Sequence, residues 1–579
     1  MKTNILKLVM SVFAMAAILI ACNDDKKMAT TEKVERGIIL SNMDTTVSPK
    51  DDFYNYVNGS WMKNTEIPDD QVRWGGFGVL RKSTDADVLE ILAKAKESGK
   101  YASDTDQAKA LAIFATELDT VARNKAGITP LQPALDKIAA IESISDFQKV
   151  MTVDAVTISQ PFLGVAAFSN PNNSAINSAY ITPGGLGLPN RDFYVNTDEK
   201  SIEIRDQYTE HITRMLQFLG DSEADARAQA ETILAFETKL AIPRLDKVAS
   251  RDFRNFNNPR SMAEIQAMAP AIQWEQAFKD MGVTKQLDTL IVMQPAYMEV
   301  VQNTLAEGDV DTWKTVMRWA TLNDAAGRLS TEIDKANWDF YSKTLNGSKA
   351  QKSAKERALR TVNGSVGEAL GKLYVDEKFP PEAKAKAEKM IANVIEAYKS
   401  RINNLKWMGD STKIKAIEKL DKFTVKIGYP NKWKDYSTMD VKAENTYYDN
   451  MVAVGAWDFQ DNLKDIDEPV DRTEWGMSPQ TVNAYFNPIN NEIVFPAAIL
   501  QPPFYNYTAD EAVNYGGIGA VIGHEISHAF DDSGARFDGD GNVNNWWTPE
   551  DLEEFTKRGD ALAEQYSAIK VADSLYING

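Results

Sequence analysis

Two histidines and a glutamate within one short segment carry the clearest chemistry in this sequence. The segment reads His524-Glu525-Ile526-Ser527-His528. On a helix, residues i and i+4 share a face, so both imidazoles can meet one cation. Imidazole nitrogens suit Zn²⁺, which lowers the pKa of a bound water toward about 7. Glu525 lies one residue further round, where it can act on that water as a general base. The pattern predicts one zinc ion per chain, held by His524 and His528.

The scarcity of histidine strengthens this interpretation. The chain contains only three histidines, the third being His211. The pair also falls in an apolar stretch from Val513 to Phe530, where unpaired polar groups would be costly. The alternative is that the two histidines are structural and bind neighbouring carbonyls. Asp531 follows the pair and either orients a ligand from behind or is an exposed carboxylate at the helix end.

The residues after His528 separate classes of zinc protease. A metzincin needs glycine at position 531 and histidine at 534, where this chain has Asp531 and Gly534. A glutamate from a later helix is the remaining third ligand. Thr548-Pro549-Glu550-Asp551 is typical of a helix start. The acidic residues of that helix are interpreted as solvated side chains rather than ligands: Glu550, Glu553, Glu554 and Glu564.

A second acidic segment resembles a calcium loop without meeting its requirements. It runs from Asp538 to Asn542. An EF-hand needs glycine and glutamate where this chain has Val543 and Pro549. The segment therefore predicts a turn in which Asp and Asn side chains bind their own backbone.

The elements that must position these residues are mainly helical. Apolar residues recur at spacings of three and four from position 51 onward. Helices are predicted over 85–97, 104–122, 222–240, 383–405, 513–530 and 548–569. Strand candidates are few, at 423–427, 484–486 and 492–495, and the Gly- and Pro-rich stretch 182–189 is expected to be a loop. We expect a mainly α protein with a small sheet near its C-terminal end.

Composition excludes some partners and cross-links. Lys and Arg number 64 against 83 Asp and Glu, giving a net charge of −19, which argues against nucleic acid as a partner. Cys22 is the only cysteine, so no intramolecular disulfide can form.

The N-terminus predicts a lipoprotein. Lys2 and Lys7 precede an apolar run from Leu8 to Ala21, which is shorter than the roughly 20 residues of a membrane-spanning helix. The run ends in Leu19-Ile20-Ala21-Cys22, which looks like a bacterial lipobox. We expect a signal peptide over 1–21, lipid on Cys22, a tether over 22–50, and a lipid-anchored location in the bacterial cell envelope, periplasmic or at the cell surface.

Several separate segments, in the right order, resemble the neprilysin and endothelin-converting-enzyme family of zinc endopeptidases. They are Asp52 to Trp61, Gly187 to Tyr194, Lys426 to Pro430, Val482 to Pro488, Glu492 to Ala497, Gly516 to Asp532 and Asn545 to Thr548. The resemblance implies a two-lobed fold in which a thermolysin-like zinc lobe and a helical lid enclose a cavity for oligopeptides. The boundaries expected from it are a helical region including the lid over 51–470 and a zinc-binding catalytic region over 471–579.

The resemblance also implies roles for individual residues. His524 and His528 match the histidine ligands, and Glu525 matches the catalytic base. Asn483 and Ala484 match the strand that pairs with the substrate backbone. Two further residues, Arg73 and Arg81, lie where the family has arginines facing the cavity, although surface arginines are the alternative.

One departure from the family bears on activity. The family's third zinc ligand is a glutamate in a later Glu-x-x-x-Asp helix, which we expect beyond Gly579, so this chain would hold zinc weakly. Two alternatives therefore stay open. The chain could be an inactive peptide-binding member of the family, or a helical surface lipoprotein that captures nutrients. The sequence does not predict an oligomeric state.

Overall fold

The computed structural model describes residues 37–572 and 575–579, so the predicted signal peptide and Cys22 lie outside the described residues. Among the described helices, none combines the length and the apolar character needed to cross a membrane. Contacts divide the chain into two compact units. The smaller falls within residues 1–66 and 508–516, and the larger comprises 67–507 and 517–579.

The smaller unit contains helices α2 (Phe53–Asn64) and α20 (Glu511–Gly516). Asp52 begins α2 by accepting a hydrogen bond from the Asn55 amide at 2.9 Å. Asp44 holds the preceding segment on this helix, because its carboxylate accepts from Lys63 Nζ at 2.5 Å and its amide donates to the Tyr56 carbonyl. The end of the predicted tether therefore packs on α2.

The larger unit has two hydrophobic cores, and each defines a lobe. The first lobe joins its helices to the four-stranded sheet β1-β2-β4-β3, in which β1 and β2 form an antiparallel hairpin. Its elements are α6 (Gln132–Ala139), α7 (Ile144–Thr152), β1 (Leu163–Asn170), β2 (Asn173–Pro183), α8 (Asp192–Val195), α9 (Glu199–Gln217), α10 (Glu223–Ala241), β3 (Pro259–Arg260), α11 (Met262–Met268), α12 (Trp274–Asp280), β4 (Leu290–Val292), α13 (Pro295–Glu307), α14 (Val310–Ala325) and α15 (Thr331–Trp338).

The second lobe surrounds the three-stranded sheet β5-β7-β6, with β5 parallel and β6 antiparallel to the central β7. Its elements are α3 (Gly76–Ser98), α4 (Asp106–Leu118), α16 (Ala354–Lys378), α17 (Pro381–Asn403), α18 (Asp410–Asp421), β5 (Thr424–Gly428), β6 (Tyr485–Asn487), β7 (Glu492–Pro496), α21 (Ile518–Ser527), α22 (Pro549–Ser567), β8 (Lys570–Ala572) and β9 (Leu575–Tyr576).

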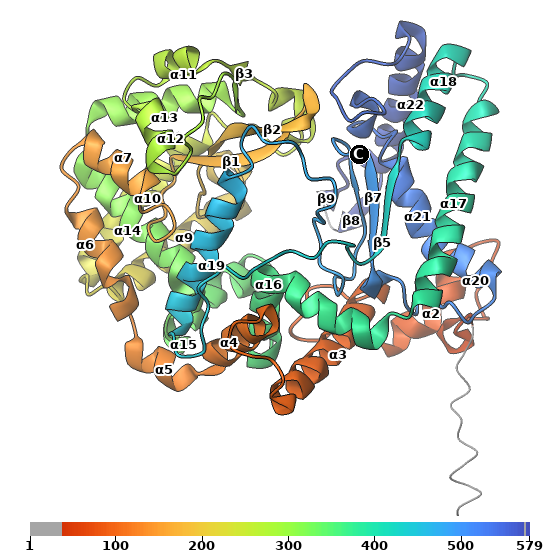
Figure 1. The fold of residues 1–579 in the computed structure, drawn as a ribbon, viewed down its shortest axis with the longest axis horizontal. Coiled ribbons are helices and arrows are strands. Elements are labelled where there is room, and N and C mark those ends of the chain that lie inside the picture. The colour runs from red at the N-terminus through yellow and green to blue at the C-terminus, as the bar shows by residue number, and fades with distance from the viewer. Residues whose placement is uncertain (1–36, 573–574) are drawn as a thin grey trace, which may run out of the picture. The chain divides into compact units, whose positions relative to one another are not determined.

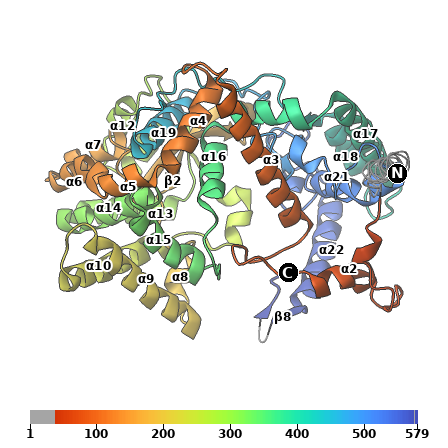
Figure 2. The same cartoon turned by 90° about the horizontal axis from the view of Figure 1, so that it is seen from below.

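Helices α5 (Thr120–Ala126) and α19 (Tyr447–Leu463) complete the larger unit. Helix α19 contributes Tyr448 and Leu463 to the first core and Val454 to the second. In two views, α16 lies between the helices around α9 and α14 and the helices around α17 and α21 (Figure 1, Figure 2). The second core includes residues from Leu80 to Trp547. It therefore contains residues from both regions expected from the sequence, 51–470 and 471–579.

The β1–β2 hairpin also contacts the second lobe directly. Its tip residue Ser174 donates from its amide to Asn542 Oδ1 at 2.9 Å and from its hydroxyl to the Asp540 carbonyl at 2.5 Å. The Val543 amide donates to the Pro171 carbonyl at 2.7 Å. The loop over 540–543, which follows the His524–His528 segment, therefore receives the hairpin tip.

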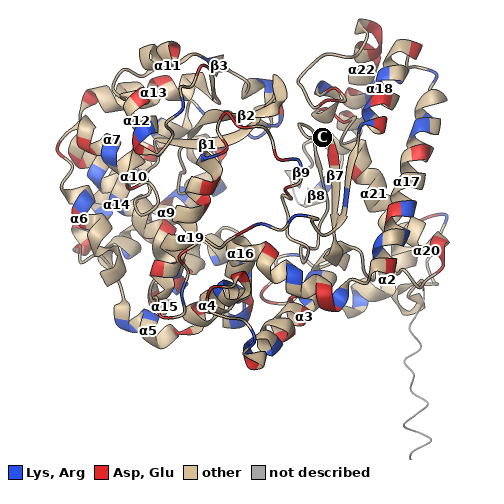
Figure 3. Ribbon diagram, viewed as in Figure 1, with Lys and Arg blue, Asp and Glu red and all other residues tan. Residues whose placement is uncertain are grey.

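The observed elements confirm a mainly helical protein with small sheets. Helices α3, α4, α10, α17 and α22 cover most of the stretches predicted from periodicity, and β5, β6 and β7 match the three strand candidates. Ser222 and Thr548 begin their helices as N-caps, each accepting a backbone hydrogen bond three residues on. Acidic and basic residues are interspersed along the helices (Figure 3), so the net charge of −19 is not the product of one segment.

The sequence prediction was wrong about one helix and missed the β1–β2 hairpin. The single helix expected over 513–530 is two helices, because Gly517 has non-helical angles (φ −93°, ψ −95°) and α21 ends at Ser527. The expected loop 182–189 begins inside β2, which ends at Pro183.

Candidate metal centre

Helix α21 carries the predicted metal-binding residues. Ile518, Ile522 and Ile526 recur every four residues and are almost fully buried, so they fix one face of the helix in the second core. His524 and His528 fall on another face, and His528 is the residue that caps the helix. Neighbours hold α21 in place. It packs against α17 and β6, and Tyr398 of α17 donates a hydrogen bond from its hydroxyl to the Gly523 carbonyl at 2.7 Å.

The two imidazoles converge at their Nε2 atoms, which lie 3.1 Å apart. Two nitrogens bound to one tetrahedral zinc at about 2.0–2.1 Å would lie about 3.3 Å apart. His528 Nδ1 lies 2.7 Å from Asp531 Oδ2, and the carboxylate requires that nitrogen to be the donor. The Nε2 lone pair of His528 is then free to bind a cation. The donor set of this pair therefore fits zinc.

Glu525 lies beside this pair with its side chain largely withdrawn from solvent. It is 6% exposed on the buried side of α21. Burial raises the pKa of its carboxyl, and the neighbouring His524 and His528 offset part of that rise. A carboxyl with a raised pKa is better matched to proton transfer than a solvated one.

Asp531 is held in a tight turn that follows α21. Its Oδ1 accepts hydrogen bonds from the amides of Ser533 at 3.0 Å and Gly534 at 2.7 Å. Glycine is required at 534, because a Cβ there would lie 1.8 Å from the His528 carbonyl oxygen. Of the two interpretations of Asp531 from sequence, the geometry favours the one in which it orients a histidine.

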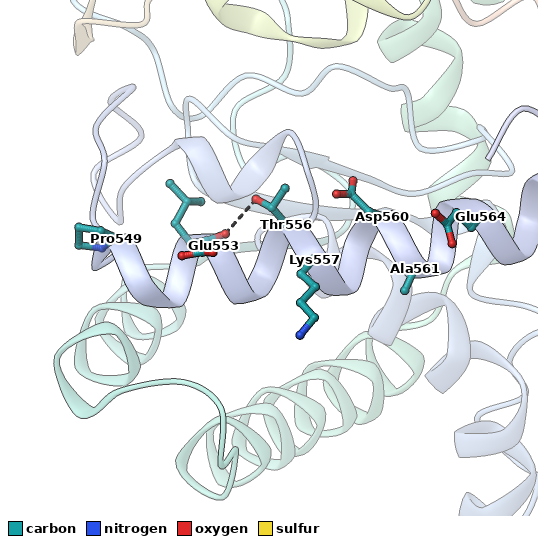
Figure 4. Close-up of a pocket in the computed structure, with 8 residues that line it drawn as sticks. Pro549, Glu553, Thr556, Lys557, Asp560, Ala561 and Glu564 are labelled. Atoms are coloured by element: carbon teal, nitrogen blue, oxygen red, sulfur yellow. Dashed lines mark hydrogen bonds between the residues drawn. The ribbon is translucent and has the colours of Figure 1, made fainter.

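The described residues supply no third ligand. Within residues 37–572 and 575–579, no group of three or more His, Cys, Asp or Glu side chains is arranged to hold a metal. The acidic residues of α22 form no such group. Glu553 and Glu564 line a shallow hollow along that one helix (Figure 4), and Glu554 pairs with Arg558 at 2.7 Å.

The strand predicted to bind substrate stands at the edge of its sheet. Strand β6 begins directly after Ala484 and pairs on one side with β7, while its helix neighbour is α21. Asn483 is exposed, whereas Ala484 is buried. An edge strand beside the histidine pair has the placement that backbone pairing with a peptide requires.

The remaining predicted residues are less closely defined by the structure. Arg73 precedes α3 and Arg81 lies on it, and both side chains are exposed, which suits a surface role as well as a substrate role. The turn over 538–542 is confirmed as self-bonded, since Asp538 Oδ1 accepts from the amides of Asp540 and Asn542 at 3.0 Å each.

Comparisons with known proteins agree along nearly the whole chain. Two models described as peptidase family M13 match residues 49–430 and 483–579. Neprilysin-3 from Drosophila melanogaster is 32% identical, over 92% of this chain and 71% of its own length. The neutral endopeptidase of Lactobacillus helveticus is 32% identical, over 93% of this chain and 82% of its own. The zinc metalloprotease Zmp1 of Mycobacterium tuberculosis, solved with an inhibitor, matches at 37% identity and a TM-score of 0.87, covering 92% of this chain and 81% of that structure.

Proposed function

This chain belongs to peptidase family M13, the family of neprilysin and the endothelin-converting enzymes, and from that membership we propose that it is a zinc-dependent endopeptidase. Its substrates are oligopeptides cut at internal bonds. The observation that carries the proposal is the convergence of His524 and His528 at 3.1 Å with Glu525 on the same helix. Paired imidazoles with an adjacent buried carboxylate suit metal-assisted hydrolysis.

Each residue of the helix has a distinct task in this reaction. His524 and His528 hold the zinc ion through Nε2, and Asp531 keeps His528 in the tautomer that leaves Nε2 unprotonated. When bound, the zinc ion supplies Lewis-acid chemistry toward a peptide carbonyl. The Glu525 carboxylate takes a proton from the attacking water and delivers it to the nitrogen of the departing amine.

Strand β6 positions the peptide. An extended substrate adds to the free edge of β6 through backbone hydrogen bonds, with Asn483 and Ala484 directly before the strand. Because backbone groups are common to all peptides, this pairing aligns the scissile bond without demanding one sequence. A cavity between the lobes that admits oligopeptides, with Arg73 and Arg81 facing it, extends the same proposal.

We further propose that the protein is anchored outside the cytoplasm of a bacterium through lipid on Cys22. The support is the apolar run that ends in Leu19-Ile20-Ala21-Cys22. Intact-mass measurement of protein from the native membrane tests this: a mass increase from diacylglyceryl on Cys22 is expected, and a cleaved chain without lipid at that residue would contradict it.

A second candidate function is peptide binding without hydrolysis. The observation that favours it is the edge position of β6, which allows pairing with a peptide backbone whether or not a metal is bound.

A quenched-fluorescence peptide assay separates the two candidates. We expect cleavage that a chelator abolishes and added zinc restores, with Glu525→Gln at least about 100-fold slower while its zinc content is unchanged. Glu550→Gln, an exposed carboxylate on α22, is the matched control and should cleave like the wild type. A wild type that binds the peptide without cutting it supports the second candidate. Equal rates for Glu525→Gln and wild type would remove Glu525 from the reaction.

A further inference from the structure

A buried lysine lies directly behind the turn that follows the metal helix. Lys419, on α18, is 1% exposed, and the ion pairs among the described residues do not include it. Its ammonium instead donates to three backbone carbonyls, those of Ala529 at 2.9 Å, Gly534 at 2.8 Å and Phe537 at 2.7 Å. An ammonium is the side-chain group that offers three donors from a single atom.

The three carbonyls belong to residues that precede and follow Asp531 in the chain. Ala529 and Gly534 stand on either side of it, so one ammonium holds both ends of the turn that contains this carboxylate. Inside the turn, Asp531 accepts from the Gly534 amide through Oδ1 and binds His528 Nδ1 through Oδ2. A movement of Gly534 therefore moves the carboxylate that orients His528.

Aromatic rings from both sides of the site flank the same ammonium. The ring of Phe486, on β6, has its centroid 5.8 Å from Lys419 Nζ, and that of Phe530, in the turn, 5.9 Å. These distances are within the range of cation–π attraction. Lys419 thus touches the metal-side turn and the strand proposed to bind substrate.

We infer that Lys419 is a positioning residue of the metal site, which acts by fixing the turn that aims Asp531 at His528. The inference rests on the proposed zinc function of His524 and His528. Removing the ammonium leaves three buried carbonyls without their donor, and each must find a new one or become solvated. The turn reorganises to do so, and His528 loses the hydrogen bond that sets its ring orientation and tautomer.

Burial of this lysine is consistent with a fixed function. Burial lowers the pKa of Lys419 to about 7, while Asp538 and Asp531 act in the opposite direction. Burying an ammonium without a paired carboxylate is costly, so the three carbonyl bonds compensate only part of that cost.

Zinc affinity of the purified chain tests the inference. The variants are Lys419→Met, Asp531→Asn and the double variant, with zinc titrated against a chromophoric chelator at one pH. We expect each single variant to lose at least about tenfold in affinity, the range measured for residues that orient metal ligands. Because Lys419 acts through Asp531, the double variant should bind zinc no more than about twofold more weakly than Asp531→Asn.

Lys109→Met is the matched control. Lys109 is also buried, at 4% exposure, but lies on α4 and pairs with Asp106 at 3.6 Å, away from the metal helix. It should lower the urea midpoint and leave zinc affinity unchanged. Equal zinc affinity of Lys419→Met and wild type, or fully additive losses in the double variant, would overturn the inference alone. A wild type that binds no zinc overturns the proposed metal site and this inference with it.

A second measurement needs no variant, in case Lys419→Met fails to fold. Coupling between two sites is reciprocal, so zinc on the histidines should tighten the turn around Lys419. Acylation of wild-type lysines, followed by mass spectrometry, should be at least about threefold slower at Lys419 with zinc than without it. Lys109 should react equally in both states. Equal reactivity of Lys419 with and without zinc would contradict the inference.

Discussion

The three histidines of the chain occupy two opposite environments. His524 and His528 are open to solvent on one side and turn their Nε2 atoms toward each other. His211 is 3% exposed and stacks on Phe340, with ring centroids 4.8 Å apart. Its Nδ1 accepts from Arg214, and its buried Nε2 has no partner. A second proton, which would make this ring positively charged, would be buried beside the Arg214 guanidinium.

His211 should therefore make stability fall in acid. Burial, with a smaller contribution from Arg214, lowers the pKa of His211 to about 3, whereas an unfolded histidine titrates near 6.5. The unfolded state binds more protons between these values, so this contribution is complete above pH 6.5 and is lost as pH falls below it. Relative to His211→Phe, the wild-type free energy of unfolding should fall by about 1.4 kcal/mol per pH unit between pH 6 and 4. Urea unfolding at each pH measures this, and parallel profiles for the two proteins would contradict it.

The sequence alone singles out the proposed zinc ligands, but not the lysine behind them. His524, Glu525 and His528 are recognisable because their spacing alone places them together. Lys419 gives no such signal, since a lysine on an amphipathic helix is typical of a solvated face. Its burial depends on α18 packing against a turn more than a hundred residues later, which spacing along the chain does not record.

A buried ion pair joins two strands of the second sheet, β5 and β7. Lys426 of β5 and Glu492 of β7 lie 2.6 Å apart with side chains 8% and 3% exposed. Lys426 also donates to the Glu474 carbonyl at 2.6 Å. Since the same strand β7 carries β6, this pair supports the strand proposed to bind substrate.

Removing one member of this ion pair should lower the free energy of unfolding much more than replacing both members with apolar residues. We expect Lys426→Met to lower the free energy of unfolding by about 3–5 kcal/mol, because Glu492 is left buried without a partner. Adding Glu492→Leu should recover a large part of the loss. Lys239→Met, which removes an exposed pair with Glu307, should cost below about 1 kcal/mol. Chemical denaturation measures all three, and a loss for Lys426→Met as small as that of Lys239→Met would contradict the expectation.

The β1–β2 hairpin shows why some elements escaped prediction. Its strands are rich in Ala, Ser and Asn, which do not give the alternating β-branched pattern of a half-buried strand. Strand β7 was found because Glu492-Ile-Val-Phe is short, apolar and β-branched. The split of the predicted helix at Gly517 shows the same limit, because a glycine within an apolar period does not reveal whether the helix continues.

Several apolar side chains are exposed to solvent near the end of the described chain. Leu562 and Tyr566 of α22 are 55% and 49% exposed, and Leu575 and Tyr576 of the fully exposed β8–β9 hairpin are 62% and 58% exposed. Contiguous apolar surface beside an open strand edge favours association. The net charge of −19 opposes association through repulsion that salt screens.

The purified chain should therefore self-associate as salt is raised. In sedimentation velocity, the Leu562→Gln/Tyr566→Gln variant should associate less than the wild type at 0.5 M salt, with net charge unchanged. Val121→Gln is the control, because Val121 is 79% exposed as a single residue on α5. Identical sedimentation of the double variant and wild type would contradict association through Leu562 and Tyr566.

The Val543 amide proton can report on separation of the two lobes, because its hydrogen bond joins the loop over 540–543 to the hairpin tip. Any parting of the lobes at this point must release the Val543 amide from Pro171 and the Ser174 amide from Asn542. The receiving loop is itself held by Lys422 on Asp540 and by Asn491 on the Gly539 carbonyl, so the break falls at the tip rather than within the loop. Deuterium uptake at Val543 would then record how often the lobes separate, in the absence of any substrate.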